Sequence, residues 1–244
     1  IPAADARRVV EREHYSGKVV QNSQLHIGVF YGGQLEGAMQ FGPSLDKRKV
    51  AGLVRDSGWH QFTELNRMAF SDRLPRNSES RALGVAMRLI AKHAPQVKWV
   101  VSFADGAQCG DGTIYRASGF VLTGIKENDQ IIEFPDGLRE TRLVLTDSRR
   151  PRRCELAKRY GVKIGGECSL QPFIAIGAKA VPGYQFRYVR FIDPDWRDRL
   201  TVPIIPFDKI PAECRMYMGV ATMCGSSKEI PGDQSGIGGA SPTL

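Results

Sequence analysis

The sequence lacks most of the short signatures that assign an enzyme to a class on inspection. Its 244 residues contain no G-x-G-x-x-G turn, no P-loop, no H-E-x-x-H zinc motif and no G-x-S-x-G nucleophile elbow. It also has no internal repeat. These absences argue against dinucleotide-dependent enzymes, P-loop proteins, zinc proteases and α/β-hydrolases. Function must therefore be inferred from scattered polar residues and from charge.

Cysteine is scarce and long apolar runs are missing. The cysteines are odd in number and none form a C-x-x-C pair; they are Cys109, Cys154, Cys168, Cys214 and Cys224. No secretory signal precedes them, and no apolar run approaches the roughly 18 residues that a membrane span requires. We therefore expect a cytosolic protein with reduced cysteines and no membrane segment.

Positive charge is in excess. The formal net charge is +8 and the pI is near 9.4. This favours an acidic partner, first nucleic acid and second an anionic cofactor, although a basic soluble protein without such a partner has the same balance. A hydrophobic content of 42% over this length suits one large domain or two small ones. The oligomeric state is not indicated.

The order of the expected elements predicts an α/β fold with a mixed central sheet. The main ones are a helix Asp5–Glu13 capped by Asp5, a hairpin Leu25–Tyr31 and Leu35–Phe41, a strand Phe62–Phe70, a helix Glu79–Lys92, a strand Val97–Phe103, a short helix Thr113–Ser118 capped by Thr113, and a strand Tyr184–Ile192. Further strands are expected at Phe120–Lys126 and Leu143–Thr146, separated by a polar segment, and a short helix at Glu155–Tyr160. We expect a catalytic domain over residues 1–195 and an irregular, Pro- and Gly-rich extension over 196–244.

The stretch from Val97 to Phe120 concentrates reactive groups after a buried strand. Asp105, Cys109, Asp111 and Tyr115 follow the apolar run in a glycine-rich loop and a short helix. Polar groups at the exit of a core strand are where open α/β sheets usually place chemistry. Turn formation, capping and helix packing explain the same residues about equally well.

A second group of polar residues lies inside an expected strand. Glu64, Asn66 and Arg67 occur within Phe62–Phe70. Burying such groups without partners is costly, so a functional role is the better interpretation.

The start of the helix after this strand is a candidate anion site. Arg76, Asn77, Ser78, Ser80 and Arg81 surround it, with Asn77 or Ser78 as the cap. Free backbone N–H groups at a helix start attract phosphate. Any capped amphipathic helix would show a similar pattern.

Three further short segments each allow two interpretations. Lys47 and Arg48 lie in a polar loop that is either a solvated turn or a phosphate contact. Residues 149–153, Arg-Arg-Pro-Arg-Arg, form a basic cluster expected in a loop. His14 and Tyr15 end the first helix before a glycine, either as a capped terminus or as a site.

Several long motifs, in order, resemble those of one family. They are HYSG (14–17), GVFYGGQLEGAMQFG (28–42), ELNRMAFSD (64–72), NSESRALG (77–84), FADGAQCGDGTIYRASGF (103–120) and RYVRFID (187–193). Together they resemble the Mom family of bacteriophage DNA-modification proteins, over roughly residues 5 to 195. The Tyr-x-x-x-Gly-Phe turn at 115–120 is also similar to that of GNAT-type acyltransferases.

The resemblance implies a GNAT-like fold and a transferase of the host cytoplasm. Such an enzyme converts adenine in duplex DNA to N6-carbamoylmethyl-adenine (acetamido-adenine), which protects phage DNA from restriction. Asp105 would orient or deprotonate N6, Tyr115 would protonate the leaving group, and Arg67 with Asn66 would stabilise the acyl oxygen; Glu64 belongs to the same group. Tyr31, Phe41 or Tyr115 would hold the flipped base. DNA phosphates would meet six basic residues, Lys47, Arg48, Arg149, Arg150, Arg152 and Arg153.

The resemblance leaves two acyl donors open, acetyl-CoA and glycyl-tRNA. The segment Arg76–Ser80, which with Arg81 would bind donor phosphate, has no glycine pair, and this speaks against CoA. The added CH2–CO–NH2 group has the same atoms as a glycyl unit, which favours an aminoacyl-tRNA partner. The resemblance also implies iron, with His14 and Tyr15 as matching ligands and Asp105 nearby. A multi-histidine metal site is not expected.

Two other functions fit the same residues. One is an acyl-CoA-dependent N-acyltransferase that acts on a small molecule or a protein, in which case acetyl-CoA would bind tightly and DNA would not. The other is a DNA-binding module without catalysis, in which case the polar strand residues would be dispensable.

Overall fold

The structure is a computed structural model that describes residues 1–44, 46–106, 110–165 and 168–211. Its centre is a seven-stranded sheet with the order β1-β2-β3-β4-β7-β5-β6. The strands are β1 (Leu25–Tyr31), β2 (Gln34–Gly42), β3 (Phe62–Phe70), β4 (Trp99–Asp105), β5 (Val121–Glu133), β6 (Arg139–Thr141) and β7 (Lys179–Phe191). Only β3 and β4 pair in parallel among these strands, and the other neighbours are antiparallel. The predicted α/β fold with a mixed sheet is confirmed.

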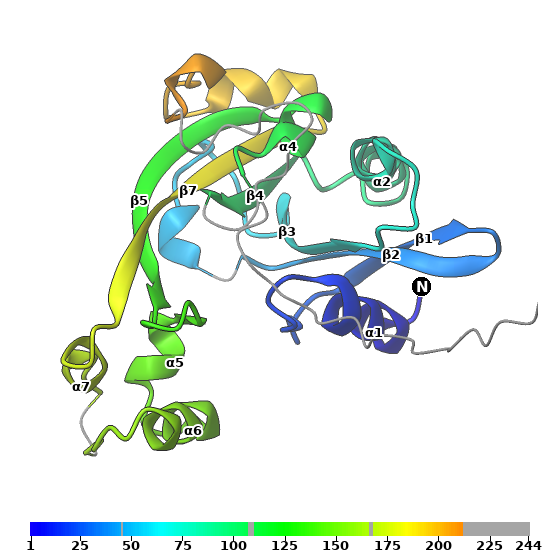
Figure 1. Ribbon diagram of the computed structural model, residues 1–244. Coiled ribbons are helices and arrows are strands. Elements are labelled where there is room, and N and C mark those ends of the chain that lie inside the picture. The colour runs from blue at the N-terminus through cyan, green and yellow to red at the C-terminus, as the bar shows by residue number, and fades with distance from the viewer. Residues whose placement is uncertain (45, 107–109, 166–167, 212–244) are drawn as a thin grey trace, which may run out of the picture.

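Helices cover both faces of the sheet (Figure 1). Helix α1 (Ala3–Glu13) packs on one face, which we call the α1 face, through Ala6, Val9 and Val10. Helices α2 (Ser78–His93) and α4 (Thr113–Ala117) lie on the opposite face, the α2 face. There α2 buries an apolar stripe of Leu83, Ala86, Met87 and Ile90. The 3.6-residue period of such a stripe is what makes one side of a helix apolar and drives its packing.

The pair β5–β7 extends beyond the rest of the sheet and carries a small lobe (Figure 1). The lobe consists of α5 (Arg142–Thr146), α6 (Pro151–Arg159) and α7 (Gln171–Ile174). Its own apolar core includes Phe134, Leu145, Leu156 and Phe173. The body and the lobe therefore have separate cores joined by one two-stranded arm.

Several local predictions in this region are wrong. Leu143–Thr146 was expected as a strand and is helical, because Val144 and Leu145 are buried against the lobe while Leu143 is exposed. A run of four apolar or branched residues does not distinguish the two states. Arg152 and Arg153 lie in the first turn of α6 and not in a loop, since Pro151 at the first helical position favours a helix start.

Two predicted caps are also wrong. Helix α1 begins at Ala3 after Pro2, so Asp5 lies in the first turn, where a carboxylate still favours the helix dipole. Helix α4 begins after Gly112 with φ of 74°, so a glycine replaces Thr113 at the cap.

The segment after β7 crosses the body as two short 3-10 helices, η2 (Pro194–Arg199) and η3 (Phe207–Lys209). Trp196 and Ile210 are buried in the cores of the α1 face and the α2 face, respectively. The part of the expected extension up to residue 211 therefore packs on the sheet, and residues 212–244 lie outside the described residues. Within the described chain, no helix is long and apolar enough to cross a membrane.

Candidate active site

The two parallel strands, β3 and β4, separate half-way along their length. β3 and β4 pair over three positions, which end at Glu64 opposite Val101. Beyond that point β3 pairs with β2, and β4 pairs with β7. We call this opening the fork. Where the two central strands separate, backbone groups that a regular sheet would pair are left for other partners, and Leu65, Asn66 and Ser102 are buried there.

A phenol lies at the fork on the α2 face. The Tyr115 hydroxyl is 2.9 Å from Ser102 Oγ, and Ser102 Oγ is 3.4 Å from the carbonyl oxygen of Leu65 across the fork. A hydroxyl carries one proton, so Ser102 donates to Leu65 when it accepts the proton of Tyr115. The Tyr115 ring packs on Tyr188, 5.1 Å between centroids, and this packing fixes its position.

The buried polar residues of β3 mark the α1 face of the fork. Glu64 accepts a 2.7 Å hydrogen bond from Ser44 Oγ. Asn66 is the extra residue of a bulge, since its neighbours Leu65 and Arg67 pair with consecutive residues of β2. A bulge turns a side chain out of the regular alternation and is common beside active sites.

The amide of Asn66 joins β3 to two loops. Its Oδ1 accepts from Ser23 Oγ at 3.0 Å, and its Nδ2 donates to the carbonyl of Pro43 at 3.3 Å. Asn66 therefore holds loops in place, and Glu64 and Asn66 both have partners, as burial requires.

Arg67 also projects on the α1 face, where it meets the end of α1. Its Nε donates to the carbonyl of Lys18 at 2.9 Å and its Nη1 to that of Asn66 at 2.7 Å. Burial, and then the charge of Arg67, lowers the pKa of His14 to about 4. The imidazole is therefore neutral at neutral pH, with Nδ1 accepting from Ser16 Oγ at 2.8 Å.

Asp105 ends β4 on the same face as Arg67. Its Oδ2 lies 3.5 Å from Asn128 Nδ2 of β5. Strand alternation places Asp105 with Phe103 on the α1 face, and Ser102 on the face of Tyr115. The phenol and the carboxylate thus flank the fork from opposite faces, and their hydrogen bonds lead to different partners.

A basic segment lies beside Asp105. This is η1 (Lys47–Lys49), which follows Asp46. Lys49 Nζ donates to Gln185 at 2.5 Å and lies 5.5 Å from the ring centroid of Phe103, and Arg187 Nη1 donates to the carbonyl of Lys49 at 3.0 Å. These contacts fix η1 on β4 and β7. Lys47 and Arg48 are exposed, and the Arg48 side chain is 93% exposed.

The predicted anion site is at the start of α2. Asn77 occupies the cap with φ of 67°, Ser78 Oγ donates to the Pro75 carbonyl, and Ser80 Oγ donates to that of Asn77. Arg76 and Arg81 are exposed beside it. Ser118, just after α4, donates from Oγ to the Ser80 carbonyl at 3.3 Å, so this helix start lies next to the helix that carries Tyr115.

The basic cluster at residues 149–153 lies in the lobe, away from the fork and η1. Arg153 is 2% exposed, and its Nε and Nη1 donate to the carbonyls of Leu145 and Gly165 at 2.7 and 3.3 Å. Arg149 and Arg150 pair with Asp147, and Arg152 pairs with Glu140 and Glu155. Arg153 is therefore a structural part of the lobe.

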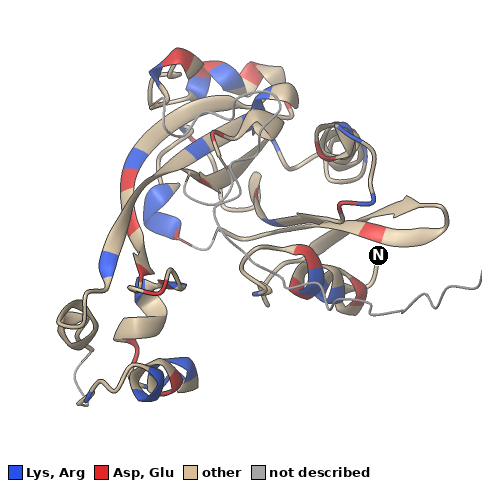
Figure 2. Ribbon diagram, in the orientation of Figure 1, with Lys and Arg blue, Asp and Glu red and all other residues tan. Residues whose placement is uncertain are grey.

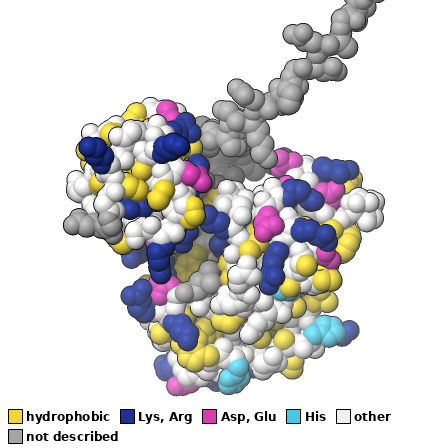
Figure 3. Space-filling view, turned by 90° about the horizontal axis from the view of Figure 1, so that it is seen from below, with side chains coloured by type: hydrophobic (Ala, Val, Ile, Leu, Met, Phe, Trp, Pro, Cys, Tyr) yellow, Lys and Arg dark blue, Asp and Glu magenta, His cyan; other side chains and the backbone are white. Residues whose placement is uncertain are grey.

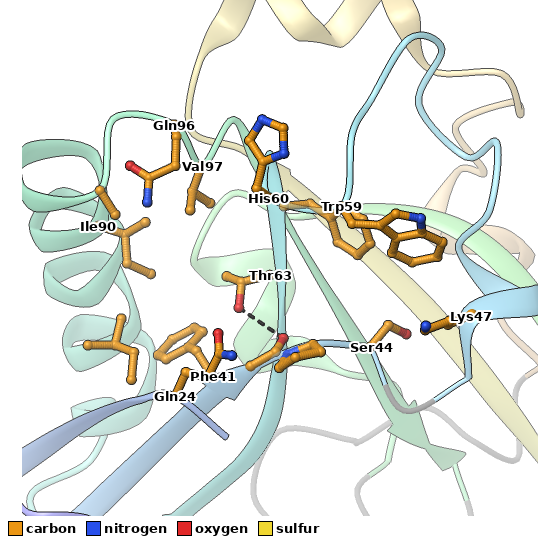
Figure 4. Close-up of a pocket in the computed structure, with 15 residues that line it drawn as sticks. Gln24, Phe41, Ser44, Lys47, Trp59, His60, Thr63, Ile90, Gln96 and Val97 are labelled. Carbon is orange, nitrogen blue, oxygen red and sulfur yellow. Dashed lines mark hydrogen bonds between the residues drawn. The ribbon is translucent and has the colours of Figure 1, made fainter. Parts of the chain in front are cut away.

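A separate hollow of about 530 Å³ lies at the other end of β3 (Figure 4). Ile90 and Val97 line one side and Ser44, Lys47 and Trp59 the other, with the start of β3 between them. Thr63 Oγ1 donates to the Gly42 carbonyl at its wall. None of the predicted catalytic residues lines it, although the Ser44–Glu64 hydrogen bond connects its wall to the fork.

The residues expected to bind iron do not form a metal centre by themselves. His14 and Tyr15 stack, 4.3 Å between ring centroids, but Nδ1 of His14 already accepts from Ser16. In the described ranges no three His, Cys, Asp or Glu residues are grouped so that they could hold a metal. The set does not fit iron, and we derive no step through it.

A family comparison identifies the group to which these features belong. The Mom protein family matches residues 1–209, which include both strands of the fork, α2, α4 and η1. The chain belongs to the Mom family. Methylcarbamoylase mom of Escherichia phage Mu is 43% identical over 124 residues, which are 50% of this chain and 51% of that protein. The chain thus spans about half the length of the curated relative that it matches.

Solved structures similar to this Mom family member are acetyltransferases. They include the Bacillus subtilis acetyltransferase in complex with CoA (9% identity, TM-score 0.38, 77% of this chain and 92% of that chain). The IAA acetyltransferase of Bacillus cereus is similar at 11% identity and a TM-score of 0.37, with 78% and 92% covered. At these scores the similarity carries no inference about ligands.

Sequence reasoning did not single out Ser102 or Trp59, and it indicated Lys49 only as part of the polar loop that begins at Asp46. Ser102 had a signal, because it is a polar residue within an apolar run. Trp59 had none, and nothing indicated the contacts of Lys49, since loop residues acquire their neighbours only when distant strands meet. Of the aromatic residues expected to hold a base, Phe41 and Tyr115 are buried, and Tyr31 is exposed beside the hairpin turn.

Proposed function

We propose that this Mom family protein is a transferase that modifies N6 of adenine in DNA to N6-carbamoylmethyl-adenine and so shields phage DNA from restriction. Family membership supports the DNA substrate, and a phenol at the fork, Tyr115, supports group transfer there. This position of a proton donor between two open strands is the observation that carries the proposal.

The acceptor base approaches from the α1 face. N6 of adenine is a poor nucleophile, because its lone pair is delocalised into the ring. Asp105, half-buried on that face, accepts a proton from N6 or orients it. The base must leave the helix stack to reach the fork, at a cost of a few kcal/mol.

The donor binds from the α2 face. Its phosphate lies at the start of α2, where Arg76, Arg81 and the first backbone N–H groups provide positive charge. The bond from Ser118 to the Ser80 carbonyl joins this helix start to the end of α4, so a donor held there lies on the same face as Tyr115. Tyr115 protonates the leaving oxygen or sulfur. Arg67 lies on the α1 face, so its guanidinium stabilises the charge on the acyl oxygen only from the other side of the fork.

The composition of the product favours a glycyl donor such as glycyl-tRNA. Attack by N6 on a glycyl ester forms N6–CO–CH2–NH2 and releases the RNA hydroxyl. Rearrangement to N6–CH2–CO–NH2 keeps every atom. Acetyl-CoA would place CO–CH3 on N6, which lacks the second nitrogen, so the nitrogen content of the modified nucleoside separates the two donors.

The duplex lies on the α1 face. Figure 3 views the molecule from below and shows Lys and Arg side chains around a hollow between the lobe and the body. Figure 2 shows basic residues on η1 and along the β5–β7 arm. Because phosphate contacts release counterions, the affinity for DNA falls steeply as salt rises.

The test is mass spectrometry of nucleosides from the DNA of cells that express the protein. Tyr115→Phe and Asp105→Asn should each reduce modified adenine about 100-fold or more, as loss of a general acid or base does. Tyr160→Phe and Asp136→Asn make the same chemical changes in the lobe, away from the fork, and should leave the yield unchanged. Undiminished yield in both fork variants would contradict the assigned roles, and no modified adenine from wild type would contradict the function.

A further inference from the structure

The hollow at the start of β3 contains an exposed aromatic platform. Trp59 is 55% exposed, and its ring centroid lies 5.4 Å from that of Phe62. Phe62 in turn stacks on Trp99, with centroids 4.4 Å apart and planes 14° from parallel. Three aromatic rings thus follow one another from the core to the surface, so the outermost ring has a packed support.

The side chains around Trp59 are basic or uncharged, which favours an electron-rich or anionic ligand. None of the residues that line the hollow is Asp or Glu, while Lys47 and His60 are basic or titratable. Lys47 Nζ lies 5.4 Å from the Trp59 ring centroid, and Arg48 is exposed next to it. Phosphate attached to a ligand on Trp59 would meet this basic segment.

The walls add hydrogen-bonding groups suited to a heteroaromatic ring. Gln24 and Gln96 line the hollow and carry amides, which donate and accept. Ile90 and Val97 lie on the same side of the hollow as Gln96 and make that side partly apolar. A volume of about 530 Å³ is within the range of small-molecule sites and accommodates one base with its sugar.

From these observations we propose that Trp59 stacks on an unstacked nucleobase whose phosphate is held by Lys47 and Arg48. This inference rests on the proposed function, since it assigns a second base contact to the nucleic acid that the enzyme modifies. An exposed cation–ring contact is weak relative to base stacking, so the base displaces Lys47 from the ring and the ammonium moves to the phosphate. The Ser44–Glu64 hydrogen bond connects the base site to the fork.

Tryptophan fluorescence provides a direct measurement. Trp99 and Trp196 are 1% and 7% exposed, so quenching by a large ligand reports Trp59. Single-stranded oligodeoxyadenylate should quench the emission, whereas an abasic oligonucleotide with the same number of phosphates should not. An oligoriboadenylate arm shows whether the base comes from DNA or from RNA, by which of the two binds more tightly.

Variants locate the contact. Trp59→Ala should weaken oligodeoxyadenylate binding about tenfold in an anisotropy titration, because stacking on an aromatic ring is lost. Trp59→Phe should retain most of the affinity, which excludes a folding defect as the cause. Phe30→Ala, a similar truncation of an exposed ring on the hairpin, should have no effect. Equal binding of adenylate and abasic oligonucleotides, or equal effects of Trp59→Ala and Phe30→Ala, would overturn the base site.

The outcome is separable from that of the proposed function. Modified adenine in cellular DNA together with no preference for adenylate would refute the base site alone. Quenching at Trp59 without modified adenine would refute the proposed chemistry and leave a nucleobase site.

Discussion

Two basic segments of this chain look alike in sequence and differ in structure. Residues 47–49 are Lys-Arg-Lys and form η1, and residues 149–153 are Arg-Arg-Pro-Arg-Arg and lead into α6. η1 has one acidic neighbour in its own turn, Asp46. The three arginines of the second segment that are not buried pair with three carboxylates, those of Asp147, Glu140 and Glu155.

The difference concerns net local charge and not the number of basic residues. η1 with Asp46 carries two net positive charges, and Arg149, Arg150 and Arg152 with their three carboxylate partners carry none. Polyanions respond to the summed field of a surface. The segment with fewer arginines is thus the better candidate for contact with DNA phosphates.

The two segments also differ in the part of the molecule on which they pack. η1 rests on the body sheet, held by Arg187 and by the Lys49 contacts to Gln185 and Phe103. The second segment belongs to the lobe at the end of the β5–β7 arm, where Arg153 is buried. One segment is fixed next to Asp105, and the other stabilises a satellite core.

The largest effect should follow from removing the buried guanidinium. Arg153→Met keeps most of the apolar stem but leaves the carbonyls of Leu145 and Gly165 without a donor, which should cost about 3 kcal/mol of unfolding free energy. Urea unfolding measures this. Arg152→Met makes the same change at a neighbouring, 47% exposed side chain and should stay within about 0.5 kcal/mol. Equal losses in the two variants would remove the distinction between buried and exposed arginines.

The burial of Arg153 shows where sequence patterns stop being informative. The longer elements were predictable: the β1–β2 hairpin from its glycine turn, β3 from alternation, α2 from its helical period and β4 from a continuous apolar run. The lobe was predictable only in part. The helix expected at Glu155–Tyr160 overlaps α6, but the other short apolar runs pack into a separate core that has no local sequence signal. From sequence alone, an arginine such as Arg153 is expected to be exposed. Only the structure shows that the carbonyls of Leu145 and Gly165 bind it inside the lobe.

The position of the candidate site was also predictable in part. Polar residues inside β3 and after β4 indicated a site, and the fork lies between these strands. The face of the sheet on which each side chain lies could not be predicted. The bulge at Asn66 reverses the strand alternation after it, so simple alternation assigns Arg67 to the wrong face. Contacts between segments distant in sequence, such as Arg187 with η1 or Tyr115 with Ser102, have no local signal.

An intermediate effect is expected from η1 itself. Lys47→Ala combined with Arg48→Ala removes two phosphate contacts, so the affinity for a duplex should fall about tenfold at moderate salt. The slope of log K against log salt should become shallower by about 1.8, which is two contacts at roughly 0.9 each. Anisotropy titrations at several salt concentrations measure both. An unchanged slope would remove η1 from the DNA interface.

The smallest effect is expected from the matched pair on the lobe. Arg149→Ala combined with Arg150→Ala also removes two positive charges, but Asp147 loses its partners at the same time. Exposed ion pairs contribute little, so stability should change by less than about 0.5 kcal/mol. Because these arginines are already neutralised, the salt slope should shift less than in the η1 variant, and the affinity by less than about twofold. Loss of affinity equal to that of the η1 variant would mean that DNA displaces Asp147 from both arginines and that the two segments grip the duplex together.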